Sequence, residues 1–314
     1  MQIITGTDEF YIEGGTAVGI GKFDGVHLGH QTLMDALRRY KEEKDPSLKT
    51  AVFTFDPTPE FYFSGGKARC VTTREEKREI LSDLGIDVLV EYPFREDTAG
   101  VLPEDFLKNY VVKMLQARFV AAGEDLSFGY RGLGDFSLLD AFGKEYGYET
   151  KRIEKLKMDG EIISSTRIRE AVEQGEMEKA CALLGRPYAF LGRIMHGQHL
   201  GTSLGTPTIN MYPAADKCLP PFGVYYSRAK VGEKVYAGLT NVGVRPTVTA
   251  GEKEAAVSVE TFLFDCQDDL YDLQADVQLL SFKRPEQRFA NEEELAKAIR
   301  RDIEDGKAFH AKTP

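Results

Sequence analysis

The first half of the chain alternates short apolar segments with longer amphipathic ones. Four segments rich in β-branched or aromatic residues have the length of buried strands: 16–21, 50–55, 87–92 and 117–123. Between them, helical spacing and helix-start signals predict three helices: 31–44, 74–84 and 103–115. This alternation is typical of βαβ units and predicts a parallel sheet covered by helices.

After Gly185 the pattern changes to short strands. Two helices come just before this change, at 165–174 and 177–184, and a glycine ends each. Six strand-like segments then follow, separated by turn residues: 190–195, 207–212, 223–231, 234–242, 256–264 and 276–282. With a last helix predicted at 292–304, they indicate a small antiparallel β-barrel plus a helix. We therefore expect two domains, 1–186 and 187–314.

Composition narrows the class of protein. The chain has 314 residues, 42% of them hydrophobic, which is enough for two separate cores. Its 40 Lys and Arg against 50 Asp and Glu give a net charge of −10, which disfavours nucleic acid as a partner. The four cysteines form no CxxC pair, so no disulfide framework is indicated. Without a signal-peptide pattern or a long apolar segment, we expect a cytoplasmic protein with no membrane association.

The segment GKFDGVHLGH, residues 21–30, lies where the first predicted strand ends and the first long helix begins. In an open parallel sheet, ligands bind at this edge. Glycines, among them Gly21 and Gly25, permit close approach of the backbone to a ligand. His27 and His30 lie three residues apart and can direct ring N–H groups at one anionic point. They could instead be packed or capping residues, but two of only five histidines in one HxGH motif favour phosphate chemistry.

A second polar cluster, ISSTRIR, occupies residues 163–169. It places Ser164, Ser165 and Thr166 at a helix N-terminus, followed by arginines that include Arg169. Hydroxyl, amide and guanidinium donors together form an anion cradle. On its own, the serine and threonine run could be only a helix cap. Together with HxGH, it predicts the other half of a triphosphate site.

HxGH followed by ISSTxIR resembles the adenylyltransferase half of bacterial bifunctional riboflavin kinase/FAD synthetases, in the HIGH-type nucleotidylyltransferase superfamily. The similarity extends through FDPTPEF (55–61), GEDLSFG (123–129) and ALLGRPY (182–188). Thr58 and Leu126 stand where that family often has His and Phe.

The resemblance implies a Rossmann-like nucleotidylyltransferase domain for residues 1–186. In it, His27 and His30 would stabilise the transition state at the α-phosphate of ATP. Asp24 and Asp125 would lie in the same cleft, with their exact roles open, and Asp56 and Asp125 would contact the flavin or line that cleft. The residues implied to bind ATP are Gly21, Phe23, Asp24, Gly25, His27, His30, Ser164, Ser165, Thr166 and Arg169.

In the second half, a glycine-punctuated loop at 197–210 leads into a strand that presents Thr208 and Asn210 on one side. Their oxygens are hard ligands, so the pair is suited to Mg²⁺ bound with ATP. Glu260 lies in a strand pattern among apolar residues, where a carboxylate is costly unless it is used. It is a candidate general base for transfer to a hydroxyl, or a solvated residue on the exposed face of the strand.

Four motifs here resemble, in order, a riboflavin kinase domain: PTIN (207–210), LPPFGVYY (219–226), NVGVRPTV (241–248) and VETFLFDCQDDLYD (259–272). The resemblance implies that Thr208 and Asn210 bind Mg²⁺ and ATP and that Glu260 is the base for the riboflavin 5′-hydroxyl. Gly201 and Gly205 would also contact ATP. Thr202, Thr206 and Ile209 replace the Arg, Phe and Ala that this family often has.

The resemblance therefore implies two reactions, with ATP as co-substrate of both: riboflavin to FMN, and FMN to FAD with release of pyrophosphate. Two alternatives remain open. One is an adenylyltransferase for another phosphorylated acceptor, which would not need the barrel motifs. The other is a non-catalytic flavin-binding regulator, suggested by Thr202 and Thr206 but disfavoured by intact His27, His30 and Glu260. The oligomeric state is not predicted.

Overall fold

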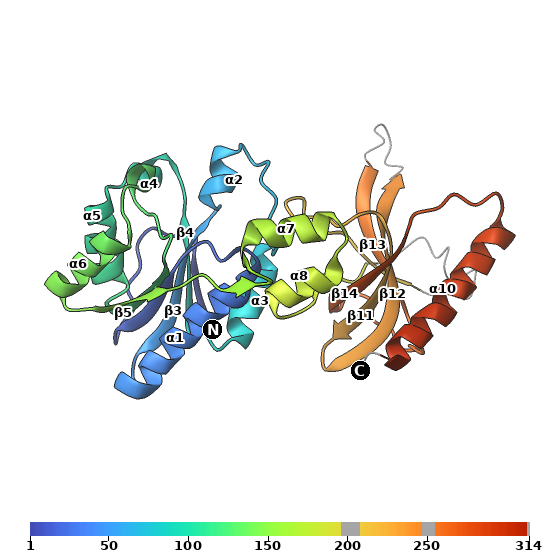
Figure 1. Ribbon diagram of the computed structural model, residues 1–314, viewed down its shortest axis with the longest axis horizontal. Helices are drawn as coiled ribbons and strands as arrows, with labels where there is room; N and C mark the ends of the chain where they lie inside the picture. Colours follow the sequence, from blue (N-terminus) through green and yellow to red (C-terminus); the bar gives the residue numbers. More distant parts are fainter. Residues whose placement is uncertain (196–207, 247–254, 313–314) are drawn as a thin grey trace. The chain divides into compact units, whose positions relative to one another are not determined.

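The structure is a computed structural model that describes residues 1–195, 208–246 and 255–312. The chain divides into two compact units, Met1–Ser165 and Thr166–Pro314, each built around one main sheet (Figure 1). The expected domain boundary at 186/187 stays a prediction, because compactness assigns the two helices before it to the second unit.

Six parallel strands form the sheet of the first unit, in the order β1-β4-β3-β2-β5-β6. They are β1 (Gln2–Thr5), β2 (Thr16–Ile20), β3 (Lys49–Asp56), β4 (Val88–Pro93), β5 (Ala117–Gly123) and β6 (Glu149–Ile153). β2 and β4 are buried at every position, as expected for strands covered on both faces. The parallel sheet is thus confirmed. The two edge strands, β1 and β6, were not predicted.

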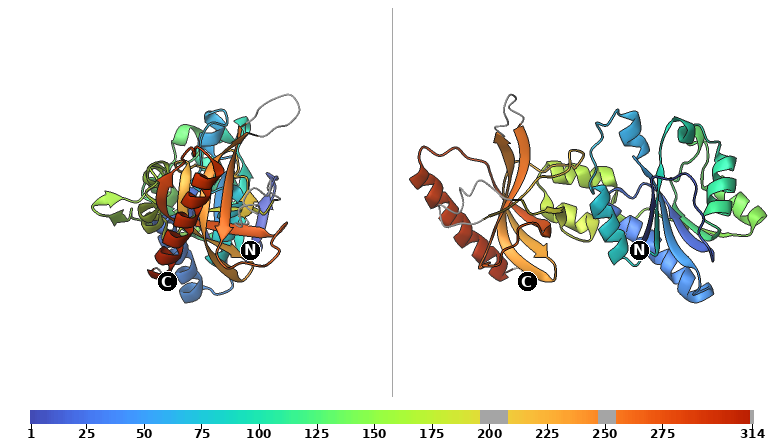
Figure 2. Two further views of the ribbon diagram at one scale, coloured as in Figure 1. Left: turned by 90° about the vertical axis from the view of Figure 1, so that its right-hand side faces the viewer. Right: turned by 180° about the vertical axis from the view of Figure 1, so that it is seen from behind.

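Helices cover both faces of this sheet (Figures 1 and 2). One apolar cluster joins Leu37 and Leu81 of two helices to Val52 of β3; the other joins Phe53 to Leu107 and Leu139. Val52 and Phe53 of β3 therefore belong to the clusters on opposite faces of the sheet, because successive side chains of a strand point to opposite faces. The helices are α1 (Leu28–Lys44), α2 (Pro59–Phe63), α3 (Arg74–Asp83), α4 (Glu96–Ala99), α5 (Pro103–Phe106), its π-helical continuation η2 (Leu107–Met114) and α6 (Phe136–Tyr146). Short 3₁₀ turns, η1 (Asp24–Val26) and η3 (Tyr130–Gly132), and the hairpin β7 (Lys157–Met158) and β8 (Glu161–Ile162) complete the unit.

The second unit is an antiparallel sheet in the order β10-β13-β12-β11-β14-β9. Its strands are β9 (Tyr188–Arg193), β10 (Thr208–Met211), β11 (Gly223–Val231), β12 (Lys234–Pro246), β13 (Ala255–Leu263) and β14 (Gln274–Pro285). A bridge between Met195 and Asn210 joins the two edges, so the sheet curls into the expected barrel-like form. The helices are α7 (Ser165–Glu173), α8 (Met177–Leu184) and α10 (Glu292–Lys312).

Three hydroxyl groups lie inside this curled sheet. Ser227, Thr240 and Thr261 are fully buried, and the Thr240 hydroxyl lies 2.7 Å from that of Ser227 and 2.8 Å from that of Thr261. Each therefore has a partner, as buried polar groups require. Since side chains alternate along a strand, Glu260 faces the other side of the sheet.

The terminal helix is longer than predicted, because α10 continues past Glu304 to Lys312. Gly306 lies within it rather than ending it. A Cβ at Gly306 would lie 2.7 Å from the Phe264 ring, so the glycine allows α10 to approach the sheet closely. Further along, Phe309 stacks on Tyr226 with ring centroids 4.3 Å apart.

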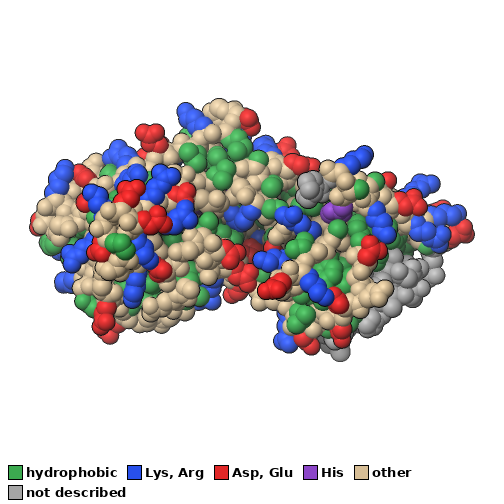
Figure 3. All heavy atoms as spheres, turned by 90° about the horizontal axis from the view of Figure 1, so that it is seen from below, with side chains coloured by type: hydrophobic (Ala, Val, Ile, Leu, Met, Phe, Trp, Pro, Cys, Tyr) green, Lys and Arg blue, Asp and Glu red, His purple; other side chains and the backbone are tan. Residues whose placement is uncertain are grey.

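Charged side chains of both signs are interspersed on the face drawn in Figure 3. The four cysteines all lie in the described part of the chain and form no disulfide. Among the described helices, none has both the length and the apolar character needed to cross a membrane.

Candidate active sites

The GKFDGVHLGH segment leaves the carboxyl end of β2, where the strand order reverses. β2 pairs with β3 on one side and with β5 on the other, so the strands that follow β2 in the chain lie on both sides of it. Such a switch point in a parallel sheet is where ligands bind. Turn η1 follows β2, and α1 then begins directly after His27.

The backbone of this segment is strained and is held from outside. Phe23 and Val26 have φ values of 52° and 39°, which are unfavourable for residues with a side chain. The Gly25 N–H donates to Thr72 Oγ1 at 3.0 Å. The hydroxyl of Ser165 donates to the Asp24 carbonyl oxygen at 2.8 Å, so the ISSTRIR segment contacts the GKFDG turn.

The Asp24 carboxylate also holds this turn. One of its oxygens, Oδ1, accepts the backbone N–H groups of Val71 at 2.8 Å and Thr72 at 3.3 Å. This oxygen is therefore engaged within the protein, and the expected role of Asp24 in binding ATP stays a prediction.

The two histidines of the motif stack on one another. Their ring centroids are 3.7 Å apart and the rings are nearly parallel, at 16°. The His30 backbone N–H donates to His27 Nδ1 at 3.3 Å, so a neutral His27 carries its proton on Nε2. His27 therefore caps α1 through Nδ1, and its contact with phosphate stays a prediction. A Cβ at Gly29 would lie 3.2 Å from the His27 ring, so a side chain there would require that ring to shift by a few tenths of an ångström.

Lys77 on α3 is a buried cation beside the same turn. Its Nζ donates to the Lys22 carbonyl oxygen at 3.1 Å, and Thr54 Oγ1 donates to the same oxygen at 3.3 Å. Burial lowers the pKa of Lys77, against the charge of Asp24, which raises it. Sequence reasoning missed Lys77, because EEKRE has the pattern of a solvated helix face.

Two further predicted carboxylates follow strands next to β2. Asp56 ends β3 and pairs with Arg74 at 2.9 Å. Asp125 comes just after β5 and pairs with Lys155 at 3.1 Å. Carboxyl ends of neighbouring parallel strands meet at one edge, so both follow strands that flank β2 at the edge from which the histidine motif leaves.

The remaining predicted ATP contacts divide between the units. Ser164 is partly buried in the first unit, whereas Thr166 and Arg169 belong to the second. Their place in the site stays a prediction. Of the residues that depart from the family pattern, Thr58 caps α2 by accepting the Phe61 N–H at 3.3 Å.

Glu91 of β4 is a buried carboxylate that pairs with two arginines of α3, one of which also pairs with Asp56. Its side chain is 2% exposed, and Oε2 lies 3.0 Å from Arg74 Nε and 2.5 Å from Arg78 Nη2. Burial alone would raise the pKa of Glu91, but the hydrogen bond from Arg78 and the charges of both guanidinium groups hold that pKa below its usual value. Through Arg74, the same network reaches Asp56.

We expect Glu91→Gln to lower the free energy of unfolding by about 2 kcal/mol, because it removes the carboxylate that faces the partly buried Arg78 and leaves Arg74 with Asp56 as its carboxylate partner. The ionised carboxylate stabilises the fold above its unfolded pKa of about 4.3, and that contribution is lost as pH falls through the lower folded pKa. Denaturant unfolding at pH 7 and pH 3 should therefore show a smaller difference at pH 3. The exposed Glu13→Gln is the control, and an equal difference at both pH values would contradict the ion-pair account.

In the second unit, strand register brings the predicted kinase residues together. Glu260 of β13 pairs directly with Asn210 of β10 on one side and with Asn241 of β12 on the other. Directly paired residues in antiparallel strands have Cβ atoms about 5 Å apart on the same face. Thr208 lies two residues before Asn210, on that face. Ser258 Oγ donates to Glu260 Oε1 at 3.3 Å.

Asn210 provides a test of the expected cation. Its side chain is 3% exposed, and within the described part of the chain its Oδ1 has no hydrogen-bond partner. A buried amide oxygen without a donor is suited to a hard cation. Among the described residues, no cluster of three His, Cys, Asp or Glu could hold a metal ion. Gly201, Gly205, Thr202 and Thr206 lie outside the described residues.

Two family models match the chain, one in each half. Residues 11–167 match the FAD synthetase model, and residues 184–310 match the riboflavin kinase model. Proteins named bifunctional riboflavin kinase/FMN adenylyltransferase are similar over almost the whole chain. The one from Escherichia coli K12 is 36% identical, over 95% of this chain and 94% of its own. The one from Listeria monocytogenes is 33% identical, over 94% and 92%.

The fold also matches a solved structure. A crystal structure described as a macrolide-efflux protein from Streptococcus pneumoniae has a TM-score of 0.79 and 25% identity, covering 95% of both chains. The sequence matches support neither of the two alternatives. They favour neither an adenylyltransferase for another phosphorylated acceptor nor a non-catalytic flavin-binding regulator. Both halves of the chain, and the order in which they occur, are those of one enzyme family. The chain belongs to the bifunctional riboflavin kinase/FMN adenylyltransferases, which phosphorylate riboflavin to FMN and adenylylate FMN to FAD.

Proposed function

We propose that the two reactions use separate sites: the carboxyl edge of β2, β3 and β5 for adenylyl transfer, and the face of β10, β13 and β12 that carries Glu260 for phosphoryl transfer. The observation that carries this proposal is the direct pairing of Glu260 with Asn210, far along the chain from the HxGH motif. ATP is the co-substrate in both reactions. We further propose that the enzyme acts in the cytoplasm, where ATP is available.

In adenylyl transfer, the FMN phosphate attacks the α-phosphorus of ATP and pyrophosphate leaves. His27 and His30 would donate ring N–H groups to the α-phosphate oxygens, where negative charge grows in the transition state. Stacking of the two rings would hold both donors in place before the reaction, and Gly25 and Phe23 would bring backbone close to the nucleotide. Ser164, Ser165, Thr166 and Arg169 would hold the leaving phosphates.

In phosphoryl transfer, the 5′-hydroxyl of riboflavin attacks the γ-phosphorus of ATP, the bond from that phosphorus to the bridging oxygen breaks, and ADP leaves. Glu260 would accept the hydroxyl proton, with its carboxylate oriented by Ser258. No covalent enzyme intermediate is needed, because positioning and charge stabilisation can lower the barrier. Mg²⁺, when bound, would neutralise phosphate charge, and Thr208 and Asn210 would hold it.

We expect Asn210→Ala to raise the Mg²⁺ concentration needed for half-maximal FMN formation by about tenfold, because it removes one oxygen ligand from a site with few. A Mg²⁺ titration of the kinase reaction at saturating riboflavin measures this change. FMN-to-FAD conversion by the same variant is the control. A lower maximal rate with an unchanged Mg²⁺ midpoint would assign Asn210 to another role.

Product analysis with riboflavin and FMN supplied separately tests the proposal as a whole. With riboflavin, ATP and Mg²⁺, FMN should appear first and FAD after it; with FMN, FAD should appear directly. Folded protein that forms neither product would overturn the assignment of both sites.

A further inference from the structure

Asn241 lies beside Glu260 on the side away from Asn210. The three residues form one row across β10, β13 and β12. If Asn210 holds the cation and the phosphate chain, the attacking hydroxyl must approach Glu260 from elsewhere. Asn241 is the paired polar side chain on that other side, and it is partly exposed, so a ligand can reach it.

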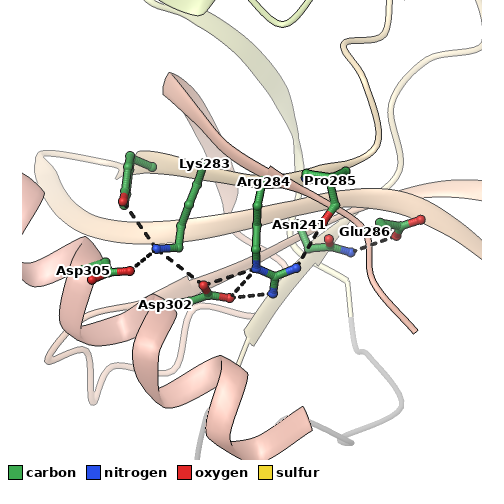
Figure 4. Close-up of polar contacts among 8 residues, drawn as sticks. Asn241, Lys283, Arg284, Pro285, Glu286, Asp302 and Asp305 are labelled. Carbon is green, nitrogen blue, oxygen red and sulfur yellow. Dashed lines mark hydrogen bonds and ion pairs between the residues drawn. The ribbon is translucent and has the colours of Figure 1, made fainter. Parts of the chain in front are cut away.

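A carboxylate accompanies Asn241. Its amide Nδ2 lies 3.5 Å from Oε1 of Glu286, which follows the last residue of β14 (Figure 4). Glu286 lies over Gly243: a Cβ at that position would overlap Glu286 Oε1 and would come within 3.2 Å of Asn241 Nδ2. A glycine at 243 is therefore what lets the carboxylate and the amide meet.

The backbone next to Glu286 is fixed by ion pairs to α10. Arg284 Nη2 lies 2.6 Å from Asp302 Oδ2, and Arg284 Nη1 donates to the Pro285 carbonyl oxygen at 3.1 Å (Figure 4). The Glu286 N–H donates to the Phe222 carbonyl oxygen at 3.4 Å. Glu286 is exposed, but the strand end that carries it is anchored on both sides.

An amide and a carboxylate next to a general base are suited to a particular ligand chemistry. A carboxylate accepts hydrogen bonds, and an amide both donates and accepts them. Each secondary hydroxyl of a polyol also donates and accepts, so it can bond to both groups. The ribityl chain of riboflavin carries such hydroxyls next to the terminal one that is phosphorylated. No aromatic surface is needed for this contact, and the pair would not bind an isolated phosphate, because Glu286 repels it.

We propose that Asn241 and Glu286 form a polyol subsite that binds the secondary hydroxyls of the riboflavin side chain and so aligns its 5′-hydroxyl with Glu260. The subsite rests on the proposed phosphoryl-transfer site. The subsite selects riboflavin by the hydroxyls of its ribityl chain. It also raises the fraction of bound riboflavin whose 5′-oxygen is in line with the γ-phosphorus.

The test compares two acceptors: riboflavin, and a 10-(5-hydroxypentyl) flavin that keeps the ring system and terminal hydroxyl but lacks the secondary hydroxyls. The wild-type enzyme should have a higher kcat/KM for riboflavin. Asn241→Ala and Glu286→Gln should each reduce that preference by about tenfold, the effect of one lost hydrogen bond to a charged or well-placed group. Their kcat/KM for the hydroxypentyl flavin should change little. Gly243→Ala, which moves the Glu286 carboxylate without removing it, should also reduce the preference.

Glu233→Gln, in the exposed turn between β11 and β12, is the matched control, and FMN-to-FAD conversion checks the rest of the chain. Equal losses with both acceptors would mean a structural role and would overturn the subsite, as would an unchanged preference. Glu260→Gln separates the two levels of the proposal. If Glu260→Gln loses less than about tenfold in kcat for FMN formation, the phosphoryl-transfer site itself is wrong; if it loses more, while Asn241→Ala keeps the full preference, only the polyol subsite is wrong.

Discussion

Glu260→Gln is expected to lower kcat for FMN formation by about 10²–10⁴-fold, the contribution typical of a general base. Glutamine keeps the size of the side chain and can still contact Ser258, but it cannot take the proton of the attacking hydroxyl. KM for riboflavin should change much less than kcat, because the lost interaction is made only as the proton moves. Riboflavin turnover in the presence of ATP and Mg²⁺ measures both constants.

The same variant should convert FMN to FAD at the wild-type rate, since the histidine motif lies in the other compact unit. Glu233→Gln should leave both activities unchanged. A loss of less than tenfold in kcat would assign Glu260 to a solvated position on the face of its strand, the alternative that its sequence context left open.

His30→Ala is expected to have the opposite selectivity. FAD formation from FMN should fall by about 10²–10³-fold, the usual cost of removing one donor to a developing oxyanion. The alanine keeps the backbone N–H that His27 Nδ1 accepts, so the cap of α1 remains while the stacked ring is lost. The reaction started from FMN with ATP isolates this step.

FMN formation by His30→Ala should be unchanged. His310→Ala is a matched histidine control, because His310 contacts the Gly238 carbonyl oxygen in the second unit and should leave FAD formation from FMN unaffected. Equal loss of both activities in His30→Ala would contradict the model of two separate sites.

The sequence predicted the central strands of the parallel sheet because they are buried on both faces and form continuous apolar segments. It did not predict β6, whose residues are mostly exposed and charged because the strand lies at an edge. The predicted end of the last helix, at Glu304, was wrong because the helix continues to Lys312. Glycine usually stops a helix, but Gly306 is retained for close packing against Phe264, which only the tertiary structure shows.

The candidate sites were predictable where a motif is local in sequence and not where contacts depend on register. HxGH and PTIN each lie within a few residues. Asn241 could not be selected, because alternation indicates which face a residue takes but not which residue of another strand lies opposite it. Lys77 was missed because burial of a lysine depends on the turn packed over it. Register and burial are both products of the folded chain.

The alternation of Glu260 and Thr261 along β13 also restricts how this enzyme can change in length. A single residue inserted before Glu260 would turn the carboxylate into the hydroxyl-lined interior and would bring Thr261 to the face of Asn210. Insertions and deletions in natural variants should therefore accumulate in the turn at 232–233, and not within β13. A library of single-residue insertions, selected for growth that depends on this enzyme, would show that distribution directly.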